Sequence, residues 1–571
     1  MRRVASVPAG KPRLLPREIT QPELIWPGKY SEDGALVESP RGCLPLQTAE
    51  TFGAEAAWRN KLIWGDNLLV MQSLLPEYAG KIDLIYIDPP FATGTDFSFG
   101  QELAYRDRWK PNPYLTMMAE RLRLIRELLS PGGSLFLHCD WHVGHLLRTI
   151  GDEVFGTENF LNEIVWYYYN KFQGNVKRFA CNHDVVFWWR KSAAYQFRPQ
   201  LEKRAEGKVR QLARQWDKEK GSIVNAKGAD GRVIYRETEE RTVDDVWRIP
   251  MLQPADRTEN CGFPTQKPEA LLRRILLSAS SEGDLVADFF CGSGTLPAVA
   301  EKLHRRWIAC DLGRWGVHTT RKRVLGIHRD TSFEILSFGR GERRHWYGMA
   351  FPEGQDDYVA FILKLYGAWP ACVVPPIHGK KGDALVHVGG VNEPITAKEI
   401  DSAVDECAQL TQKELHVLGW EWETACRDEI AGREGVKLRL LQIPTEVMEK
   451  QAAQKADVRF FPLSCLGAEV KRVGDLAAQV VLTNFTIPHI DPADERKNWS
   501  DYIDYWAVDW DFRNDVFHQG WAAWRTRKEV TLSLASCPHT YEDVGRRSVL
   551  VRVIDIFGNE TRRALEFDGK Q

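Results

Sequence analysis

The stretch Ile82-Asp83-Leu84-Ile85-Tyr86-Ile87-Asp88-Pro89-Pro90-Phe91 decides the fold. Residues 82–87 form an almost continuous apolar run, which is typical of a strand buried in a parallel sheet. An acid, two prolines and an aromatic residue follow where this strand is expected to end. Proline fixes φ and carries no N–H donor, so the turn is expected to leave its carbonyl groups free for a ligand.

Helical and strand patterns alternate on both sides of this stretch. Apolar residues recur at helical spacing over 114–129, and Pro131-Gly132-Gly133 is expected to stop that helix before a strand at 135–137. Further along, we predict a helix at 268–278, a strand at 284–290, a helix at 296–303 and a strand at 307–310. The alternation predicts an α/β fold with a mostly parallel, doubly wound sheet.

The length of 571 residues predicts roughly three or four domains. We predict an N-terminal arm (1–56), a large α/β domain (57–345) with an insertion (170–255), a small α/β module (346–465) and a β-sandwich (466–571). In the small module we expect strands at 384–388 and 414–420 and a helix at 397–409. In the sandwich, alternation predicts strands at 478–484, 530–534 and 548–555.

The composition favours a protein of the cytoplasm. Hydrophobic residues make up 43% of the chain and charged residues 27%, and no apolar run reaches about 18 residues. We therefore expect no membrane segment, and the N-terminus has no secretory signal pattern. The 11 cysteines form no C-x-x-C pair. Cys139, His142 and His145 have a spacing that suits a metal, but without a fourth ligand nearby a plain helix face is favoured and no metal site is expected.

Asp88, Pro89, Pro90 and Phe91 are the first candidate site. A carboxylate and free carbonyls accept hydrogen bonds, and an aromatic ring offers a stacking face. These groups suit a planar ligand that bears an amine, such as a nucleobase flipped out of a duplex. The alternative interpretation is an ordinary turn with a solvated aspartate. The buried strand that precedes the turn disfavours this interpretation.

The second candidate site lies at the other predicted strand end. Asp288, Phe290, Gly292 and Gly294 belong to a glycine-rich turn between a strand and a helix, and Asp311 ends the next strand about 20 residues later. Glycines let a ligand approach the backbone, and an acid at this spacing accepts hydrogen bonds from ribose hydroxyls. The pattern favours a nucleoside cofactor over a purely structural glycine turn.

Several motifs in a fixed order make the chain resemble the β class of amino-group DNA methyltransferases, and in particular the modification subunit of type III restriction systems. The resemblance covers about residues 57–330, with the catalytic motif before the cofactor loop. It rests on residues 64–68, 75–81, 86–91 with Thr93-Gly94, Trp109 with 115–118, 153–156 with 158–160, 164–166, Pro264-Thr265-Gln266-Lys267-Pro268 and Gly292-Ser293-Gly294-Thr295.

The resemblance implies a Rossmann-like methyltransferase domain that uses S-adenosylmethionine. Thr265, Gln266 and Lys267 would hold the methionine end of the cofactor, and Asp311 would bind its ribose. The other residues expected at the cofactor are Asp66, Asn67, Asp288, Phe290, Gly292 and Gly294. The resemblance also implies that Asp88 and the Pro89 carbonyl accept hydrogen bonds from the exocyclic amine and that Phe91 stacks on the base.

The base expected from the resemblance is adenine, methylated at N6. Family members with aspartate in the first motif position mostly modify adenine, whereas serine there is commoner in cytosine N4 enzymes. No Pro-Cys dipeptide occurs, so a covalent C5-cytosine mechanism is not indicated. Cytosine N4 methylation stays an alternative, as does a catalytically silent subunit that only reads DNA, although the intact Asp88–Phe91 motif argues against the latter.

Residues 187–220 hold ten Lys or Arg against four Asp or Glu, although the whole chain carries a net charge of −2. They fall where the family keeps its target-recognition insertion, so we expect them to meet phosphates of double-stranded DNA. The alternative is a solvated helix face with core tryptophans. The predicted DNA-binding residues are Arg190, Lys191, Lys203, Arg204, Lys208, Arg210 and Arg214.

The C-terminal part resembles an immunoglobulin-like sandwich of the polycystic-kidney-disease type. This weaker resemblance rests on residues 505–511, 539–541 and 553–559. Such a module suggests DNA clamping, dimerisation or docking of another subunit. The resemblance as a whole implies a restriction-modification or phage-defence role, with a helicase–nuclease restriction subunit and a second copy of the chain as expected partners. No P-loop motif is present in the chain itself.

Overall fold

The structure is a computed structural model, and its chain divides into two compact units. The first holds residues 1–42 and 66–327, and the second holds residues 43–65 and 328–571. None of the described helices is both long and apolar enough to span a membrane. The structure describes residues 23–569 except 32, 39–41, 95, 96, 100, 101, 106, 108, 173–176, 178, 205, 206, 219, 257, 329, 330, 353, 372–374, 424–434, 449–457, 459, 488–495, 497, 527 and 528.

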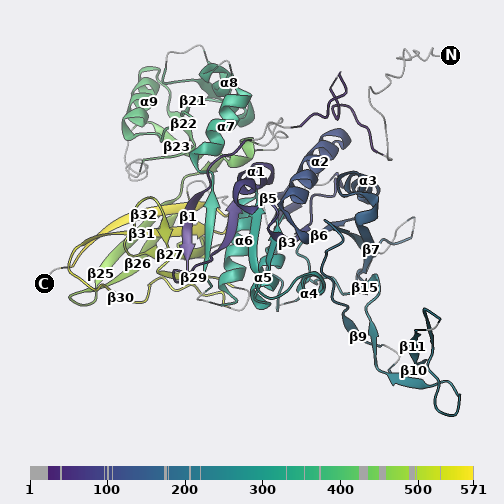
Figure 1. The fold of residues 1–571 in the computed structure, drawn as a ribbon. Helices are drawn as coiled ribbons and strands as arrows, with labels where there is room; N and C mark the ends of the chain where they lie inside the picture. The colour runs from purple at the N-terminus through teal and green to yellow at the C-terminus, as the bar shows by residue number, and fades with distance from the viewer. Residues whose placement is uncertain are drawn as a thin grey trace, which may run out of the picture. The chain divides into compact units, whose positions relative to one another are not determined.

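The sheet of the first unit has the strand order β15-β7-β8-β6-β3-β16-β17. Figure 1 shows β15, β7, β6 and β3 of this sheet. Neighbouring strands are parallel except where β8 lies antiparallel to both β6 and β7. The sheet is therefore mixed, with a parallel core, as predicted for a Rossmann-like domain. Its strands are β3 (Ile82–Ile87), β6 (Leu129–Cys139), β7 (Phe160–Tyr167), β8 (His183–Arg190), β15 (Val246–Arg248), β16 (Leu285–Asp288) and β17 (Arg306–Asp311).

Two groups of helices accompany this sheet. Helices α1 (Asn67–Tyr78), α2 (Pro111–Leu128) and α3 (Gly144–Phe155) pack on one another, as do α4 (Glu269–Ala279), α5 (Thr295–Lys302) and α6 (Arg314–Leu325). The connection β3-α2-β6 steps towards one edge of the sheet, and β16-α5-β17 steps towards the other. Since such crossovers are right-handed, α2 and α5 cover opposite faces. The step direction changes between β3 and β16, which is where ligands bind in doubly wound sheets.

Two local predictions need correction. Helix α2 ends at Leu128, but strand β6 begins at Leu129 and runs through Pro131-Gly132-Gly133 instead of starting at Leu135. Trp188 and Trp189, counted with the basic insertion, lie buried in β8. Burying two indole rings inside the sheet stabilises the fold more than exposing them at DNA would. The first residues of the segment predicted to be basic surface therefore belong to the core.

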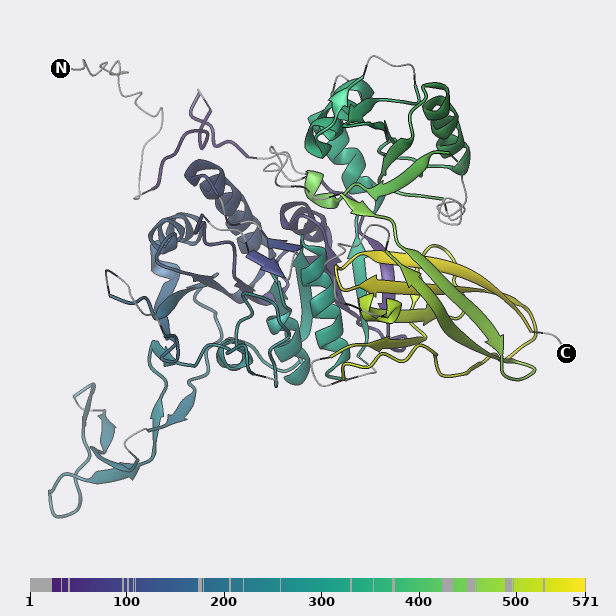
Figure 2. The same ribbon diagram turned by 180° about the vertical axis from the view of Figure 1, so that it is seen from behind.

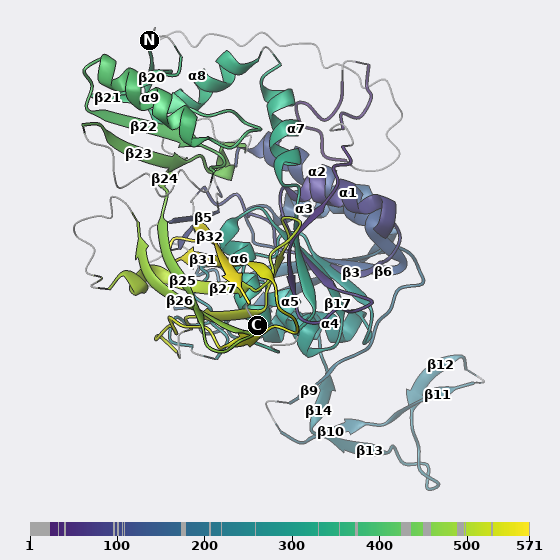
Figure 3. The ribbon, with the colours of Figure 1, turned by 90° about the vertical axis from the view of Figure 1, so that its left-hand side faces the viewer.

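The rest of that segment forms an arm of three two-stranded ribbons (Figures 1–3). Figure 3 shows the ribbons β9/β14, β10/β13 and β11/β12 leading away from the body of the first unit. The strands are β9 (Leu201–Lys203), β10 (Val209–Leu212), β11 (Arg214–Asp217), β12 (Ser222–Asn225), β13 (Tyr235–Thr238) and β14 (Glu240–Thr242), and a further hairpin pairs β4 (Phe97–Phe99) with β5 (Glu102–Tyr105).

The second unit contains a small α/β module with the strand order β19-β20-β21-β22-β23-β24. Strands β21, β22 and β23 are parallel, and α9 links the first two, as the sequence predicted. The module comprises α7 (Arg340–Ala350), α8 (Gln355–Tyr366), β19 (Trp369–Pro370), β20 (Gly379–Lys381), β21 (Ala384–Val388), α9 (Ala397–Gln409), β22 (Glu414–Gly419), β23 (Lys437–Gln442) and β24 (Phe461–Pro462).

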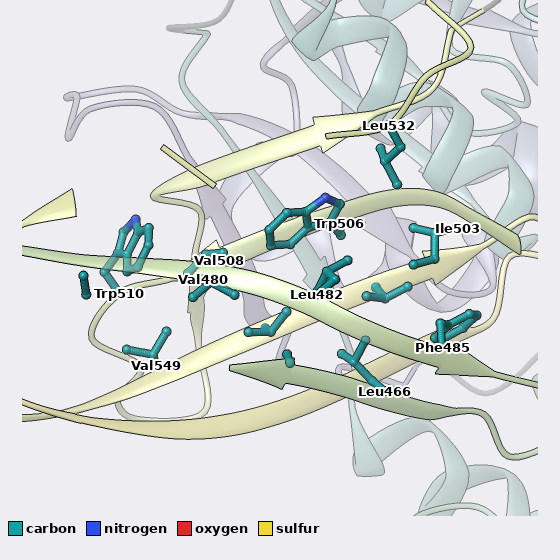
Figure 4. Packing of buried hydrophobic residues seen from close by; sticks show 14 of the residues in the cluster. Leu466, Val480, Leu482, Phe485, Ile503, Trp506, Val508, Trp510, Leu532 and Val549 are labelled. Carbon is teal, nitrogen blue, oxygen red and sulfur yellow. The ribbon is translucent and has the colours of Figure 1, made fainter. Parts of the chain in front are cut away.

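The same unit ends in two antiparallel sheets, β25-β26-β30 and β29-β27-β31-β32, whose inner faces share one core (Figure 4). Trp506, Val480 and Val549 meet there. Residues 530–534 form no strand among the described residues, although Leu532 is buried and the Leu534 carbonyl accepts from Leu482 N–H, so that prediction is wrong. The strands are β25 (Cys465–Arg472), β26 (Ala477–Thr486), β27 (Ile503–Asp509), β29 (Trp521–Trp524), β30 (His539–Thr540), β31 (Arg546–Asp555) and β32 (Glu560–Asp568).

Strands from both ends of the sequence also meet in the second unit. Strands β1 (Gln47–Phe52), β2 (Asn60–Trp64), β18 (Phe333–Ser337) and β28 (Phe517–His518) lie in the order β2-β18-β1-β28. Glu50 of β1 forms a 2.5 Å ion pair with Arg552 of β31, and the Arg552 side chain is completely buried. A buried charge of this kind requires its partner, so the pair fastens β1 to the sandwich.

Candidate active site

Three acidic residues lie at the carboxyl ends of three neighbouring parallel strands. Asp88 follows β3, Asp288 ends β16 and Asp311 ends β17. Because these strands run side by side in the same direction, both motifs singled out in the sequence lie along one edge of the sheet. They flank the change of step direction between β3 and β16, the position that suits a ligand.

The two carboxylate oxygens of Asp88 have different surroundings. Oδ2 forms an ion pair with Lys267 Nζ, and both side chains are largely buried. Oδ1 is buried and has no hydrogen-bond partner among the described residues. A buried acceptor without a donor costs free energy, typically about 1–3 kcal/mol. Asp88 therefore holds one acceptor that a ligand donor would satisfy.

Two residues that the sequence analysis missed hold the turn after Asp88. The Tyr114 hydroxyl donates to the Pro90 carbonyl at 2.9 Å, so this carbonyl is not free, contrary to expectation. The buried Asp107 carboxylate accepts from the backbone N–H groups of Ala92, at 2.6 Å, and Thr93, at 2.9 Å. Ala92 has a φ of 54°, a left-handed conformation that these bonds stabilise. The turn is thus fixed from α2 and the segment before it.

Phe91 lies beside a buried polar chain. Its ring centroid is 5.9 Å from that of His138, a residue of β6 with no exposed surface. Tyr86 OH lies 2.9 Å from His138 Nδ1, and Asp184 Oδ2 lies 3.3 Å from Nε2. Burial acts to raise the pKa of Asp184, but the hydrogen bond and charge of His138 outweigh it and hold the pKa below its usual value. The Tyr168 hydroxyl also donates to Asp184.

The glycine-rich turn is built closely around Asp311. Its carboxylate accepts from Gly292 N–H and from Gly313 N–H, each at 2.7 Å. Burial raises the pKa of Asp311 to about 6. Gly294 has a φ of 70°, and a Cβ there would meet Thr320 Oγ1 at 2.5 Å, so only glycine fits. Each oxygen of Asp311 retains a second lone pair, which suits the hydroxyls of a ribose.

Asp288 and Phe290 lie at the start of the same turn. The Phe290 N–H donates to Asp288 Oδ1 at 2.9 Å, and burial raises the pKa of Asp288 well above its usual value. Phe290 itself is only partly buried, whereas Phe289 is completely buried. The partly exposed ring of Phe290 is therefore the one that a ligand at this turn could meet.

Asp66 and Asn67 connect helix α1 to the turn. Asp66 caps the helix by accepting from Leu68 N–H at 2.7 Å and also pairs with Arg121. The Asn67 amide donates to the Phe289 carbonyl at 2.7 Å and accepts from Arg121. The structure thus places both residues next to the predicted cofactor turn. Asn67 thus holds the Phe289 carbonyl, and Asp66 is linked to the same network through Arg121.

The three residues predicted at the methionine end have unlike surroundings. Thr265 is partly exposed. The Gln266 amide donates to the Glu259 carbonyl and accepts from Cys261 N–H, so it closes its own loop. The Lys267 ammonium lies on Asp88, and the Lys267 carbonyl accepts from Thr295 Oγ1. The closed glycine turn and the acid at the next strand fit a nucleoside cofactor, while Lys267 faces the base motif.

The predicted DNA-binding cations divide into two groups. Arg190 donates to Asn159 and the Glu158 carbonyl, and Lys191 donates to two carbonyls at the end of α2. Both are therefore engaged within the body of the first unit. Lys203, Arg204, Lys208, Arg210 and Arg214 lie on the arm, where exposed Trp216, Ile223 and Tyr235 accompany them.

Comparison with known proteins shows what this part of the chain is similar to. Residues 82–320 match the family model described as DNA methylase, of the N6 and N4 amino-methyltransferase type. The segment contains Asp88, Asp288 and Asp311. The match supports a DNA methyltransferase domain, as predicted, and it is consistent with S-adenosylmethionine as cofactor. It does not distinguish adenine from cytosine.

Individual relatives cover different parts of the chain. Type II methyltransferase M.EcaI of Enterobacter cloacae is 28% identical over 403 residues, which are 60% of this chain and 88% of the relative. The probable type III enzyme HindVI Mod subunit of Haemophilus influenzae is 38% identical over 103 residues, only 18% of this chain and 13% of its own. Among solved structures, the cytosine-N4-specific PvuII DNA methyltransferase is 17% identical, with a TM-score of 0.32, over 49% of this chain and 89% of its own.

Proposed function

We propose that this protein transfers a methyl group from S-adenosylmethionine to the exocyclic N6 amine of a flipped-out adenine in double-stranded DNA. The observation that carries the proposal is the buried, unpartnered Oδ1 of Asp88 at the end of β3. An amine donates hydrogen bonds, and this oxygen needs a donor. The DNA methylase match over residues 82–320 supports the same reaction class.

The residues of the site would divide the work between them. Asp88 Oδ1 and the Pro89 carbonyl accept from the amine and stabilise the positive charge that grows on its nitrogen. Phe91 stacks on the base, and its position is supported by His138. Asp107 and Tyr114 keep the turn in one conformation, so the amine is held in line for attack.

The cofactor would lie against the turn after β16. Asp311 would accept from the ribose hydroxyls, Gly292 and Gly294 would allow close approach, and Phe290 would line the site. Asp66 and Asn67 would keep the turn in place through Arg121 and the Phe289 carbonyl. When bound, S-adenosylmethionine would supply its sulfonium methyl group, with S-adenosylhomocysteine as the leaving group, and the amine would lose one proton.

Recognition of the DNA would fall to the arm. Its cations Lys203, Arg204, Lys208, Arg210 and Arg214 suit phosphates, and its exposed Trp216 and Tyr235 suit contact with bases or sugars. The similarity to type II and type III methyltransferases favours a role in restriction-modification. A helicase–nuclease partner, a second copy of the chain and a cytoplasmic location remain parts of the proposal.

The test is transfer of labelled methyl from S-adenosylmethionine to unmethylated bacterial DNA, with identification of the modified nucleoside after digestion. We expect N6-methyladenine from the native protein and none from Asp88→Ala. N4-methylcytosine would keep the mechanism and change the base. Cofactor binding without transfer to any DNA would favour a subunit that reads DNA without modifying it.

A further inference from the structure

Lys267 has a different partner from the one its motif implies. The resemblance predicts that it holds the methionine end of the cofactor, but its ammonium is paired with Asp88 Oδ2. The same ammonium lies 5.3 Å from the centroid of the Phe91 ring. One cation therefore contacts two of the residues that are expected to receive the base.

The backbone around Lys267 is fixed on both sides. Gln266 before it is bonded to Cys261 N–H and the Glu259 carbonyl, and Thr295 Oγ1 donates to the Lys267 carbonyl at 3.1 Å. Pro268 after it caps helix α4. Because the backbone of Lys267 is anchored, its side chain contacts Asp88 from a fixed Cα position, unlike a lysine on an open surface.

The position also has an electrostatic consequence. Asp88 and Asp288 act on each other electrostatically, and burial raises the pKa of Asp288 while the charge of Lys267 acts against that rise. Lys267 likewise adds to the effects of His138 that lower the pKa of Asp184. Two neighbouring carboxylates in a partly buried site repel each other, and a cation beside them relieves the repulsion.

We propose that Lys267 is a positioning residue for Asp88: it binds Oδ2 and thereby aims the unpartnered Oδ1 at the amine of the target base. The inference rests on the proposed function and changes the role of this residue from cofactor binding to orientation of the acceptor. The ion pair fixes Oδ2 and so restricts rotation of the carboxyl group.

The experiment compares Lys267→Gln with Lys267→Arg and with a matched control, Lys302→Gln. Lys302, at the end of α5, also forms a lysine–carboxylate pair, but with Glu269 of helix α4. Binding of S-adenosylmethionine is measured by calorimetry without DNA, and kcat is measured at saturating cofactor. We expect Lys267→Gln to bind the cofactor within about threefold of the native protein while kcat falls about 100-fold.

Two further results are expected. Lys267→Arg restores kcat to within about tenfold of the native value because it keeps a cation that pairs with carboxylates, and Lys302→Gln changes neither quantity by more than about threefold. Loss of cofactor affinity in Lys267→Gln with unchanged kcat would overturn the inference and return the residue to the methionine end. A drop of kcat in Lys302→Gln equal to that in Lys267→Gln would also overturn it.

A cycle of Lys267→Gln, Asp88→Asn and the double variant tests the pair without any reaction. We expect the effect of the double variant on the unfolding equilibrium constant to differ by at least about threefold from the product of the two single-variant effects. Additive effects would contradict the pairing. A native protein that transfers no methyl group would instead refute the proposed function, and the cycle would still report on the pair.

Discussion

Each unit contains a run of adjacent parallel strands, but the strands end differently. In the first unit, β3, β16 and β17 end in acids, and Asp88 Oδ1 has no partner among the described residues. In the small module, β22 and β23 end near polar groups that satisfy one another. Gln442 donates to the Trp420 carbonyl and accepts from Trp422, while Glu421 pairs with Arg340 and Arg343.

The difference teaches that parallel topology alone does not make a site. Both sets of strands place polar residues at their carboxyl ends, where ligands commonly bind. In the module the groups after β22 and β23 already have protein partners, and a ligand there would have to break these contacts. At Asp88 an acceptor is buried and unused, so a donor gains a bond without breaking one. The following predictions test this contrast, from the largest expected effect to the smallest.

The largest effect is expected from the acids at the two strand ends. Asp88→Ala should lower methyl transfer about 1,000-fold because the developing charge loses its acceptor. Glu421→Ala should leave the transfer rate within about twofold, although it leaves Arg340 and Arg343 without this partner. Labelled-methyl transfer measures both, with circular dichroism as the control for folding. Equal losses in the two variants would remove the contrast between the units.

Glycines after strands provide the second comparison. Gly294→Ala combines a positive φ with a close approach to Thr320, so we expect a strain of about 2 kcal/mol and about 30-fold weaker S-adenosylmethionine binding. Gly389→Ala, after β21, meets Ile395 at 2.7 Å and should lower the melting temperature without changing cofactor affinity. Calorimetry of cofactor binding separates the two, and an unchanged affinity in Gly294→Ala would speak against a cofactor at this turn.

One acid in each unit should make the free energy of unfolding depend on pH, and the two dependences should have opposite signs. The pKa of Asp311 is raised to about 6, so its burial favours the native state while it is protonated and costs stability as the pH rises from about 4 to 6. The hydrogen bond from His387 lowers the pKa of Glu399. Ionised Glu399 therefore stabilises the native state above the usual glutamate pKa, and this stabilisation is lost as the pH falls below it.

The variants Asp311→Asn and Glu399→Gln make this measurable. Relative to the native protein, Asp311→Asn should gain about 2 kcal/mol in free energy of unfolding between pH 4 and pH 6. Glu399→Gln should become relatively more stable as the pH falls below about 4.5. Denaturant titrations across this range measure both changes. The same direction of change in the two variants would contradict the assigned shifts.

The smallest effects are expected for the cations predicted to bind DNA. We expect a few-fold weaker DNA binding from each of three variants, Lys208→Gln, Arg210→Gln and Arg214→Gln. Each should also reduce the salt dependence of DNA affinity by about one released counterion, as expected when one phosphate contact is lost. Arg190→Gln should affect stability more than DNA affinity, because Asn159 and the Glu158 carbonyl already engage it. Fluorescence anisotropy at several salt concentrations tests this division, and a salt slope unchanged in all four variants would argue against DNA contact by the arm.

The elements with strong local patterns could be predicted from the sequence. Strand β3 occupies the predicted 82–87 and α9 the predicted 397–409, because buried strands and amphipathic helices carry their period in the residues themselves. The placement of Asp88, Asp288 and Asp311 along one edge also followed, since parallel strands point their ends the same way. The boundary of β6 did not, because sheet pairing with β3 and β8 draws Pro131-Gly132-Gly133 into a strand.

The residues that support the site could not be predicted in the same way. Asp107 and Tyr114 hold the turn after Asp88, and His138 and Asp184 lie behind Phe91, but their partners are far away in the sequence. A single sequence contains no signal for such contacts. The buried Trp188 and Trp189 show the converse problem, because an aromatic residue among cations reads equally well as core or as DNA-binding surface.

The ion pair between Glu50 and Arg552 has a consequence for synthesis on the ribosome. Strand β1 is translated early, but its partners β18 and β31 emerge only after the whole of residues 66–327. Residues 66–327 are therefore synthesised while β1 still has an unpaired edge and the Glu50 carboxylate has no Arg552 to pair with. A chain cut short before Phe333 would lack β18, so β1 would keep an unpaired edge that is exposed to proteases and to aggregation.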